Sequence, residues 1–229
     1  MNQEARVQRA RRLLAGIEKN HSAAALESAF GAEDMVLLDL IARDGLAIRV
    51  FTVDTGRLPW QTHELIADVR RRYGIDVDVY SPWPDSVSAY VEENGHDGFY
   101  DGTAQREACC NVRKSEPLRR ALAGKRAWIS SLRDEQAGAP LGESMHDAAF
   151  GIARFHPLAA WSEDDVWTYL HANAVPYNAL HKLGYVCIGC EPCTRALRRG
   201  EHPRTARWWW EQPDARHNVI PIRALEEAA

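Results

Sequence analysis

Strand-like and helix-like segments alternate over the first third of the chain, and this order restricts the fold more than any other feature. The residue pattern predicts two helices, over residues 34–43 and 59–73. Strands are expected before, between and after them, over residues 26–30, 47–53 and 75–80. Because this alternation is typical of parallel sheets covered by helices, we predict a doubly wound, mostly parallel α/β fold.

The second half of the chain continues this pattern and then changes character. Further strands are expected over residues 127–132 and 150–155, and Ser162 begins a capping-box pattern that predicts another helix. The C-terminal segment beyond that helix is irregular and rich in Cys and Arg. A length of 229 residues with 45% hydrophobic residues is enough for one core. We predict one domain over residues 1–211, with residues 212–229 as a divergent tail.

The charge balance limits the classes of partner. The chain has 28 Lys and Arg against 32 Asp and Glu, a net charge of -4, so it has no general attraction to nucleic acid or anionic membrane. The N-terminus lacks the apolar core of a signal peptide. No apolar run approaches the roughly 20 residues that a membrane-spanning helix needs. We therefore expect a soluble cytoplasmic protein with reduced cysteines and a local anion site.

Two loops follow predicted strands, and doubly wound sheets bind ligands at the carboxyl ends of their strands. The first loop, residues 30–34, places Gly31 at a helix start, where backbone N–H groups could hold a phosphate-like group. An ordinary turn with Asp34 as the capping acid is the interpretation that the local sequence favours. The second loop covers residues 54–57. The chain has neither a G-x-G-x-x-G nor a Walker-type phosphate motif.

The cysteines are grouped in a way that suits a soft metal centre better than disulfides. A vicinal pair, Cys109 and Cys110, is followed by Arg113 and Lys114, cations that would lower thiol pKa values and offset cluster charge. The vicinal pair has poor spacing for tetrahedral zinc, so we rank an iron–sulfur centre above zinc. The other cysteines are Cys187, Cys190 and Cys193. The predicted ligands are Cys109, Cys110, Cys190 and Cys193.

Several longer segments carry a family resemblance. They include Phe30-Gly31-Ala32-Glu33-Asp34, Asp54-Thr55-Gly56-Arg57-Leu58, Cys109-Cys110 with Arg113-Lys114, Ile188-Gly189-Cys190-Glu191-Pro192-Cys193-Thr194-Arg195, and Arg207-Trp208-Trp209-Trp210-Glu211. In these segments the chain resembles the assimilatory adenylyl-sulfate (APS) reductases, the sulfonucleotide reductases that hold a [4Fe-4S] cluster. The resemblance runs in family order from about residue 22 to 211. It implies an adenine nucleotide α-hydrolase-like (PP-loop) fold.

The resemblance also implies how the substrate is held. A modified phosphate loop and basic side chains would bind adenosine 5′-phosphosulfate (APS) near the cluster. Several converging cations suit this anionic mixed anhydride, because guanidinium groups match its oxygens. The residues that match substrate-binding positions are Phe30, Gly31, Glu33, Asp34, Asp54, Thr55, Gly56, Arg57, Lys114, Arg133, Arg195, Arg204 and Arg207.

One departure from the family concerns the nucleophile. In the family, a cysteine in a C-terminal Glu-Cys-Gly-Leu/Ile-His motif attacks the sulfur of APS, and thioredoxin later frees sulfite. Here Asn218 stands at that position, and an amide cannot replace a thiolate. The missing thiol would come from Cys187, from a partner chain or from a small thiol. Ala29 replaces a usual serine, and residues 136–140 lack the usual Ser and Thr-Arg.

The leading hypothesis is reductive cleavage of APS to sulfite and AMP in sulfate assimilation, with thioredoxin or another thiol as reductant. APS is favoured over its 3′-phosphorylated relative because the resembling enzymes with four such cysteines use APS. Loss of the usual nucleophile keeps two alternatives open. One is a redirected PP-loop sulfur-transfer enzyme. The other is a non-catalytic sulfonucleotide-binding or regulatory subunit that pairs with a complete reductase. Because the resembling enzymes often associate, a homo-oligomer is a further candidate assembly.

Overall fold

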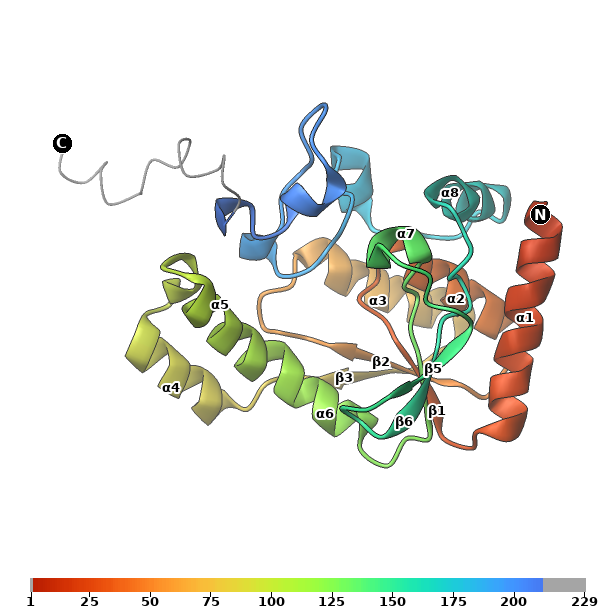
Figure 1. Ribbon diagram of the computed structural model, residues 1–229, viewed down its shortest axis with the longest axis horizontal. Coiled ribbons are helices and arrows are strands. Elements are labelled where there is room, and N and C mark those ends of the chain that lie inside the picture. Colours follow the sequence, from red (N-terminus) through yellow and green to blue (C-terminus); the bar gives the residue numbers. More distant parts are fainter. Residues whose placement is uncertain (1, 212–229) are drawn as a thin grey trace.

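The computed structural model describes residues 2–211, and a six-stranded sheet in the order β3-β2-β1-β4-β6-β5 forms its centre (Figure 1). The first five strands of that order run parallel, and β5 pairs antiparallel with β6. The mostly parallel α/β sheet predicted from the sequence is therefore confirmed. The strands are β1 (Ala24–Glu27), β2 (Arg49–Val53), β3 (Val77–Tyr80), β4 (Ala127–Ile129), β5 (Ser144–Asp147) and β6 (Ile152–Phe155).

Helices cover both faces of this sheet (Figure 1). A π-helical segment, Asn111–Ser115, joins α5 and α6 without a break. After α8 the described chain contains only short 3₁₀ turns and loops, as the irregular C-terminal sequence predicts. The helices are α1 (Gln3–Asn20), α2 (Ala32–Arg43), α3 (Trp60–Tyr73), α4 (Pro84–Asn94), α5 (Thr103–Cys110), α6 (Glu116–Leu122), α7 (Asp134–Ala137) and α8 (Glu163–Ala172).

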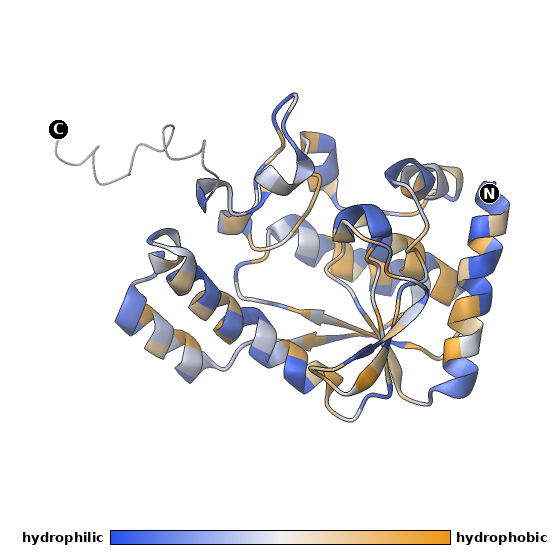
Figure 2. Cartoon of the chain, viewed as in Figure 1, coloured by the Kyte–Doolittle hydropathy of each residue, from blue (hydrophilic) through white to orange (hydrophobic). Residues whose placement is uncertain are grey.

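Alternation along the strands divides the core into two layers, since successive side chains point to opposite faces. Leu26 of β1 and Val50 of β2 are fully buried in a large cluster with α1, α2, α3 and α8. Their neighbours Ala25 and Phe51 lie in a smaller cluster that α6 covers. Helix α2 is buried along most of its length, whereas α1 shows both hydrophilic and hydrophobic colouring (Figure 2). Helix α2 is thus enclosed by the core over residues 34–41.

A buried carboxylate fixes α2 against its neighbours. Asp39 is fully buried and accepts hydrogen bonds from Tyr73 of α3 at 2.8 Å and Tyr169 of α8 at 2.7 Å. Arg43 Nε adds a third bond at 2.6 Å. A buried charge of this kind needs several donors to offset its desolvation. The network therefore sets the position of the helix whose N-terminus forms part of the candidate site.

The expected strands differ from the observed ones mainly at their ends. The segment 26–30 was expected to be extended throughout, but β1 ends at Glu27 because Phe30 has a φ of 61°, which is incompatible with a strand. The segment 127–132 likewise ends at Ile129. Strand β5 was not anticipated, because its exposed residues lack an alternating apolar pattern. The Ser162 capping box is confirmed, with Ser162 Oγ accepting from Asp165 N.

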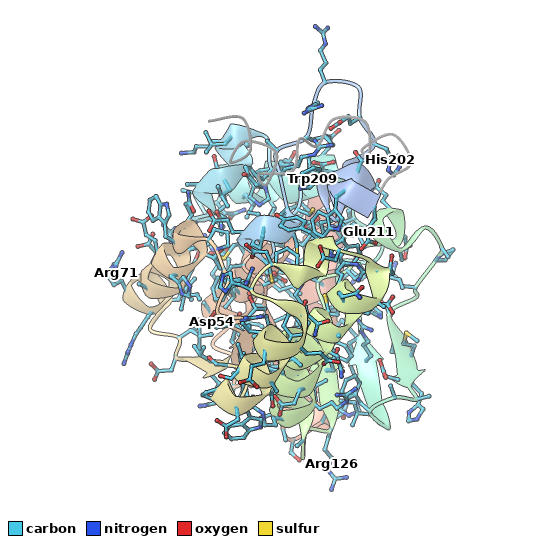
Figure 3. The ribbon with its side chains drawn as sticks, turned by 90° about the vertical axis from the view of Figure 1, so that its left-hand side faces the viewer. Asp54, Arg71, Arg126, His202, Trp209 and Glu211 are labelled. Atoms are coloured by element: carbon cyan, nitrogen blue, oxygen red, sulfur yellow. The ribbon has the colours of Figure 1, made fainter. Side chains whose placement is uncertain are left out.

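The C-terminal segment lies over the carboxyl ends of the parallel strands. Trp209 and Glu211 lie at one end of the molecule, whereas Arg126, just before β4, lies at the other (Figure 3). The backbone N–H of Glu191 donates to Arg57 O after β2 at 2.8 Å, which attaches this segment to the sheet edge. No helix within residues 2–211 is long and apolar enough to cross a membrane.

Candidate active site at the carboxyl edge of the sheet

The loop after β1 is closed by its own polar groups. Asp34 Oδ2 accepts hydrogen bonds from Ala29 N at 2.9 Å and Gly31 N at 3.0 Å, and Phe30 N donates to Ser28 Oγ. Phe30 is fully buried with a positive φ, a conformation that costs about 1 kcal/mol or more for a non-glycine residue. The prediction of a turn capped by Asp34 is therefore confirmed. The N–H groups of residues 29–31 already have protein partners.

Asp34 also connects this loop to the neighbouring strand. Its Oδ1 accepts from Ser131 Oγ at 2.5 Å, just beyond β4. Burial raises the pKa of Asp34 to about 7, even though the hydrogen bonds from Ser131 and Gly31 act to lower it. The loops after β1 and β4 therefore form one connected unit at the carboxyl edge.

Arg133 belongs to the same unit through two ion pairs. Its Nε lies 2.9 Å from Glu33 Oε1, and its Nη1 pairs with Glu135. Gln136 Nε2 also donates to Glu33 Oε1, at 2.7 Å. The guanidinium of Arg133 is buried and already bound to carboxylates. These ion pairs indicate that Arg133 holds the loops after β1 and β4 together.

The loop after β2 forms the second wall of the site. Gly56 has a φ of 70°, which favours glycine, and its N–H donates to Asp54 Oδ1 at 2.9 Å. The buried Arg113 donates from Nη1 to Thr55 O at 2.8 Å. A Cβ at Gly56 would lie 3.4 Å from this same Nη1. The turn at residues 54–57 is thus shaped to receive the guanidinium of Arg113.

Arg57 is paired in a similar way. Its Nη1 lies 3.0 Å from Asp97 Oδ1, and its guanidinium stacks over the Phe99 ring at 4.9 Å from the centroid. Tyr100 OH donates to Pro192 O at 3.1 Å, which joins the same turn to the C-terminal segment. The role of these residues was not recognised from the sequence, because residues 97–100 carry no motif.

The vicinal cysteines end α5, and the cations after them follow in the π-helical segment. In a π-helix the backbone bonds join residues five apart, and such segments often occur at functional sites. Cys109, Cys110, Arg113 and Lys114 all line one pocket. The sequence predicted this grouping of thiols and cations, but it did not predict the helix that carries it.

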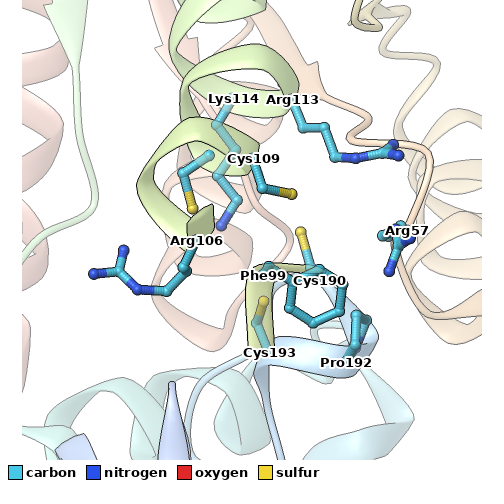
Figure 4. Close-up of a pocket in the computed structure, with 10 residues that line it drawn as sticks. Arg57, Phe99, Arg106, Cys109, Arg113, Lys114, Cys190, Pro192 and Cys193 are labelled. Atoms are coloured by element: carbon cyan, nitrogen blue, oxygen red, sulfur yellow. The ribbon is translucent and has the colours of Figure 1, made fainter. Parts of the chain in front are cut away.

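Four thiols and several cations surround this cysteine pocket (Figure 4). The sulfur atoms of Cys109, Cys190 and Cys193 face a common space, and the Lys114 side chain extends to its edge. The Cys190 thiol donates to Thr55 Oγ1 at 3.2 Å, so the pocket adjoins the loop after β2. The lining residues are Arg57, Phe99, Arg106, Cys109, Cys110, Arg113, Lys114, Cys190, Pro192 and Cys193.

The thiols interact electrostatically with one another and with these cations. The hydrogen bond between Cys190 and Cys193 lowers the pKa of Cys190 and raises that of Cys193. Burial raises the pKa of Cys109, against the lowering effect of Arg113. All five cysteines are free thiols. The predicted ligand set is therefore brought together as reduced sulfur donors.

The pocket combines thiols with unused N–H donors. No three His, Cys, Asp or Glu side chains within residues 2–211 form a group that could hold a single metal ion. Buried donors also remain without protein partners around the pocket, namely Arg113 Nε, Trp208 Nε1 and Trp210 Nε1. Four thiols with unused N–H donors are a suitable environment for an anionic cluster.

The last described residues cover the pocket from the C-terminal side. Arg106 of α5 pairs with Glu211 at 2.5 Å and stacks over the Trp208 ring at 4.5 Å from the centroid. Trp208 N donates to Cys193 O, which aligns this segment with the cysteine loop. Trp210 packs in the same apolar cluster as Cys109 and Cys193. These long-range contacts were not predicted from the sequence.

The structure separates the predicted substrate-binding cations into two groups. Arg195 forms a two-pronged ion pair with Glu201, at 2.7 and 2.9 Å, and Arg57 and Arg133 are paired as described above. Lys114 and Arg207 form no ion pair or side-chain hydrogen bond with residues 2–211, and Arg207 Nε is buried without a partner. Asn218 and the side chain of Arg204 lie outside the described part of the chain.

Comparisons with known proteins agree with this geometry. A family model, the phosphoadenosine phosphosulfate reductase domain, matches residues 23–196. The adenosine 5′-phosphosulfate reductase of Allochromatium vinosum is 52% identical over 191 residues, covering 82% of this chain and 75% of the relative. The enzyme of the same name from Burkholderia cepacia is 45% identical over 232 residues, covering 98% of this chain and 93% of the relative.

Solved structures show the same fold. The phosphoadenylyl-sulfate (PAPS) reductase of Candida auris, in a phosphate complex, superposes with a TM-score of 0.72 at 26% identity, covering 81% of this chain and 90% of that one. Yeast FAD synthetase, at 15% identity, superposes with a TM-score of 0.60 over 99% of this chain and 81% of its own, which shows a shared fold. From the family match and these relatives, the chain belongs to the phosphoadenosine phosphosulfate reductase family.

Proposed function

We propose that this protein is an adenosine 5′-phosphosulfate reductase, which cleaves APS to sulfite and AMP while two thiols are oxidised to a disulfide. The observation that carries the proposal is the convergence of four thiols and Lys114 in one pocket, with Arg207 against the neighbouring Gly189, at the carboxyl edge of a nucleotide-binding type of sheet. The names of the similar proteins support the same reaction. Free thiols throughout the chain suit a reducing, cytoplasmic setting.

Lys114 and Arg207 are the proposed contacts for the phosphosulfate group. Both cations lack carboxylate partners within residues 2–211, so binding an anion would not require them to break existing ion pairs. Arg57, Arg133 and Arg195, in contrast, shape the walls through their ion pairs. Charge-assisted bonds to phosphate-like oxygens are about twice as strong as neutral ones.

The two loops after β1 and β2 are proposed to hold the nucleotide. The loop at Gly31 leads into the N-terminus of α2, whose dipole favours the negatively charged phosphate. The turn at Gly56 adjoins the cysteine pocket, because Thr55 accepts hydrogen bonds from both Arg113 and Cys190. A nucleotide held by this turn would place its phosphosulfate near the thiols. The side chains proposed to line the nucleotide are Phe30, Glu33, Asp34, Asp54, Thr55 and Arg57, with Arg204 near the anion.

Cys109, Cys110, Cys190 and Cys193 are the proposed ligands of a [4Fe-4S] cluster. When bound, the cluster would supply a polarisable, redox-capable centre beside the anhydride. Around it, Phe99, Trp208 and Trp210 form apolar walls that exclude water. Exclusion of water strengthens the interaction of Lys114 with the developing negative charge on the leaving AMP.

The test is anaerobic purification followed by iron and sulfide analysis and an APS assay. We expect a brown protein with about four irons per chain that forms sulfite and AMP in equal amounts when APS and dithiothreitol or thioredoxin are supplied. A colourless protein that contains zinc would overturn the cluster assignment. A brown protein that binds APS tightly but releases neither product with any thiol would instead identify a sulfonucleotide-binding subunit.

Substrate choice can be tested in the same assay. APS and its 3′-phosphorylated form are compared at equal concentration, and we expect a higher kcat/KM for APS. A new sulfur-bearing product in place of sulfite, formed when ATP or APS is offered with a cell extract, would support the redirected sulfur-transfer enzyme.

A further inference from the structure

The Trp208 turn, which is residues 207–211, contains a strained backbone conformation. Arg207 pairs with Thr194 in an isolated antiparallel bridge, and Trp208 N donates to Cys193 O at 3.1 Å. Trp208 itself has a φ of 47°, in the left-handed region that bulky side chains rarely adopt. A conformation of this kind persists only where the surrounding structure enforces it. The turn therefore depends on contacts from elsewhere in the chain.

Arg106 of α5 provides contacts at both ends of this turn. Its guanidinium lies 4.5 Å from the centroid of the Trp208 ring, and its Nε lies 2.5 Å from Glu211 Oε1. The side chains of Arg106 and Glu211 are only 11% and 21% exposed, so solvent screens this ion pair less than a surface pair. Removing one partner would leave a mostly buried charge without compensation. Arg106 thus holds together the start and the end of the turn.

The Trp208 turn forms a wall of the cysteine pocket. Trp208 and Trp210 pack against the apolar cluster that contains Cys109, Cys190 and Cys193, and each of these three cysteines is less than a tenth exposed. The Arg106 side chain extends from α5 away from the sulfur atoms, towards the outer side of the pocket (Figure 4). Movement of the turn would therefore expose the thiols to solvent.

The same turn carries Arg207, one of the proposed contacts for the phosphosulfate. Arg207 precedes the strained residue, and its guanidinium lies 4.7 Å from the centroid of the Trp208 ring. It also lies against the cysteine loop, since a Cβ at Gly189 would be 3.7 Å from Arg207 Cζ. The place of this cation is therefore tied to the conformation of Trp208.

We propose that Arg106 is a positioning residue of this site: through Trp208 and Glu211 it holds the turn that closes the cysteine pocket and places Arg207 for an anionic substrate. The second role rests on the proposed APS reductase activity, whereas closure of the pocket does not. Arg106 has no contact with substrate in this scheme. Without it the Trp208 turn relaxes, solutes reach the pocket, and Arg207 loses its fixed place.

The first experiment measures access to the pocket. Cluster-loaded protein is mixed anaerobically with the iron chelator bathophenanthroline disulfonate, and iron release is followed by absorbance. Arg106→Gln and Glu211→Gln should each release iron about tenfold faster than the original chain, because an ion pair that closes the turn is lost. The double variant should release it no faster than either single variant, because the two residues act through one contact. Additive effects would contradict the proposal.

Two controls separate a local opening from a general loosening. Glu107→Gln removes the exposed carboxylate that lies 3.5 Å from Arg106 on the same helix, and it should leave iron release unchanged. Cys187 is not among the residues that line the pocket, so its alkylation by iodoacetamide serves as an internal reference and should keep its rate in every variant. Equal acceleration of Cys187 alkylation, or faster iron release in Glu107→Gln, would overturn the proposal.

The second experiment measures the placement of Arg207. In the APS assay, Arg106→Gln should raise KM about tenfold and leave kcat within about twofold, because a contact to bound substrate is weakened. Adding Arg106→Gln to Arg207→Ala should cause no further loss, since Arg106 acts through Arg207. An unchanged KM in Arg106→Gln would overturn its role in placing Arg207.

Failure of the reductase proposal can be distinguished from failure of this inference. If no protein turns over APS, the reductase proposal fails, but iron release still tests closure of the pocket. If the purified chain holds no iron, alkylation of Cys109 and Cys193 replaces iron release and should be about tenfold faster in Arg106→Gln and Glu211→Gln. Loss of the Arg106 cation alone would disfavour thiolates and slow alkylation, so faster alkylation indicates opening of the turn. Unchanged rates would contradict the proposal.

Discussion

The phosphate-loop region, which is residues 28–34 with Arg133, and the cysteine pocket both lie at the carboxyl edge of the sheet. They differ in whether their polar groups have hydrogen-bond partners within the protein. In the first region, the N–H groups of Ala29 and Gly31 bind Asp34, and Arg133 binds Glu33. In the second region, Arg113 Nε and the indole N–H groups of Trp208 and Trp210 are buried and have no hydrogen-bond partner within residues 2–211. One region is completed by the protein itself, and the other contains unused donors.

This difference indicates which parts of the site are scaffold and which are made for ligands. Buried polar groups are almost always hydrogen-bonded in folded proteins, so a concentration of unpartnered donors marks a place where another group belongs. Cations that are already paired hold loops in place, whereas Lys114 and Arg207 are available to an anion.

The largest effect is expected in the cysteine pocket. Cys190→Ser should reduce the iron content from about four per chain to near zero and lower APS reduction by about a thousandfold or more, because a cluster ligand is lost. Iron analysis and visible absorbance measure the first effect. Cys187→Ser is the matched control, since it should retain its iron. Equal loss of iron in both variants would place Cys187 among the ligands.

In the phosphate-loop region, the expected effect is on stability and its pH dependence. Burial raises the pKa of Asp34 to about 7, so the folded protein holds a proton that the unfolded chain releases near pH 4. Its contribution to stability is fully present below about pH 4 and is lost as pH rises through 7, in total about 4 kcal/mol.

Asp34→Asn removes this titration while keeping an acceptor oxygen. We expect urea unfolding of the variant to show a flatter dependence on pH between 4 and 7 than the original chain shows. The pH profile of Asp39→Asn is measured for comparison, because Asp39 is also buried but is hydrogen-bonded to two tyrosines. Identical pH profiles for Asp34→Asn and the original chain would mean that Asp34 does not titrate in this range.

The unpaired cations should matter more for substrate than the paired ones. Lys114→Ala and Arg207→Ala should each lower kcat/KM for APS by about a hundredfold, the value of one charge-assisted contact of about 2.7 kcal/mol. Arg195→Ala should lower it less than about tenfold, because its guanidinium is bound to Glu201. A loss as large in Arg195→Ala would show that this ion pair opens to receive substrate.

The smallest effect is expected far from both regions. Ser162 caps the N-terminus of α8, and Ser162→Ala should reduce the free energy of unfolding by about 1 kcal/mol. Urea denaturation measures this change. The iron content and KM for APS should not change, since α8 packs in the large core cluster and none of its residues lines the cysteine pocket. An altered KM would indicate that α8 transmits strain to the phosphate loop.

Local sequence signals predicted the order of the elements well and their ends less well. Apolar periodicity located α3 and the first strands, because burial of one face requires that pattern. The end of β1 could not be predicted from propensity, since it depends on the positive φ of Phe30. Strand β5 has exposed residues and is held by its pairing with β6, a contact that local pattern does not encode.

The candidate site, too, was predicted from the sequence only in part. The structure brings Cys109, Cys110, Cys190 and Cys193 to one pocket, as their spacing and the family resemblance indicate, and their role as cluster ligands stays a prediction. The ion pairs of Arg133 and Arg195 could not be foreseen, because their partners are chosen by the packing of loops. The same packing brings Arg106 to Glu211, a contact across 105 positions of the sequence.

By itself the sequence determined the order of strands and helices, the set of reduced thiols and the family to which the chain belongs. The tertiary structure decided which cations are paired, which donors remain without partners, and that Cys187 is not among the residues lining the cysteine pocket. The reason is physical. Hydrophobic periodicity is a local property of the chain, whereas the partner of a charge depends on which distant segments fold against it.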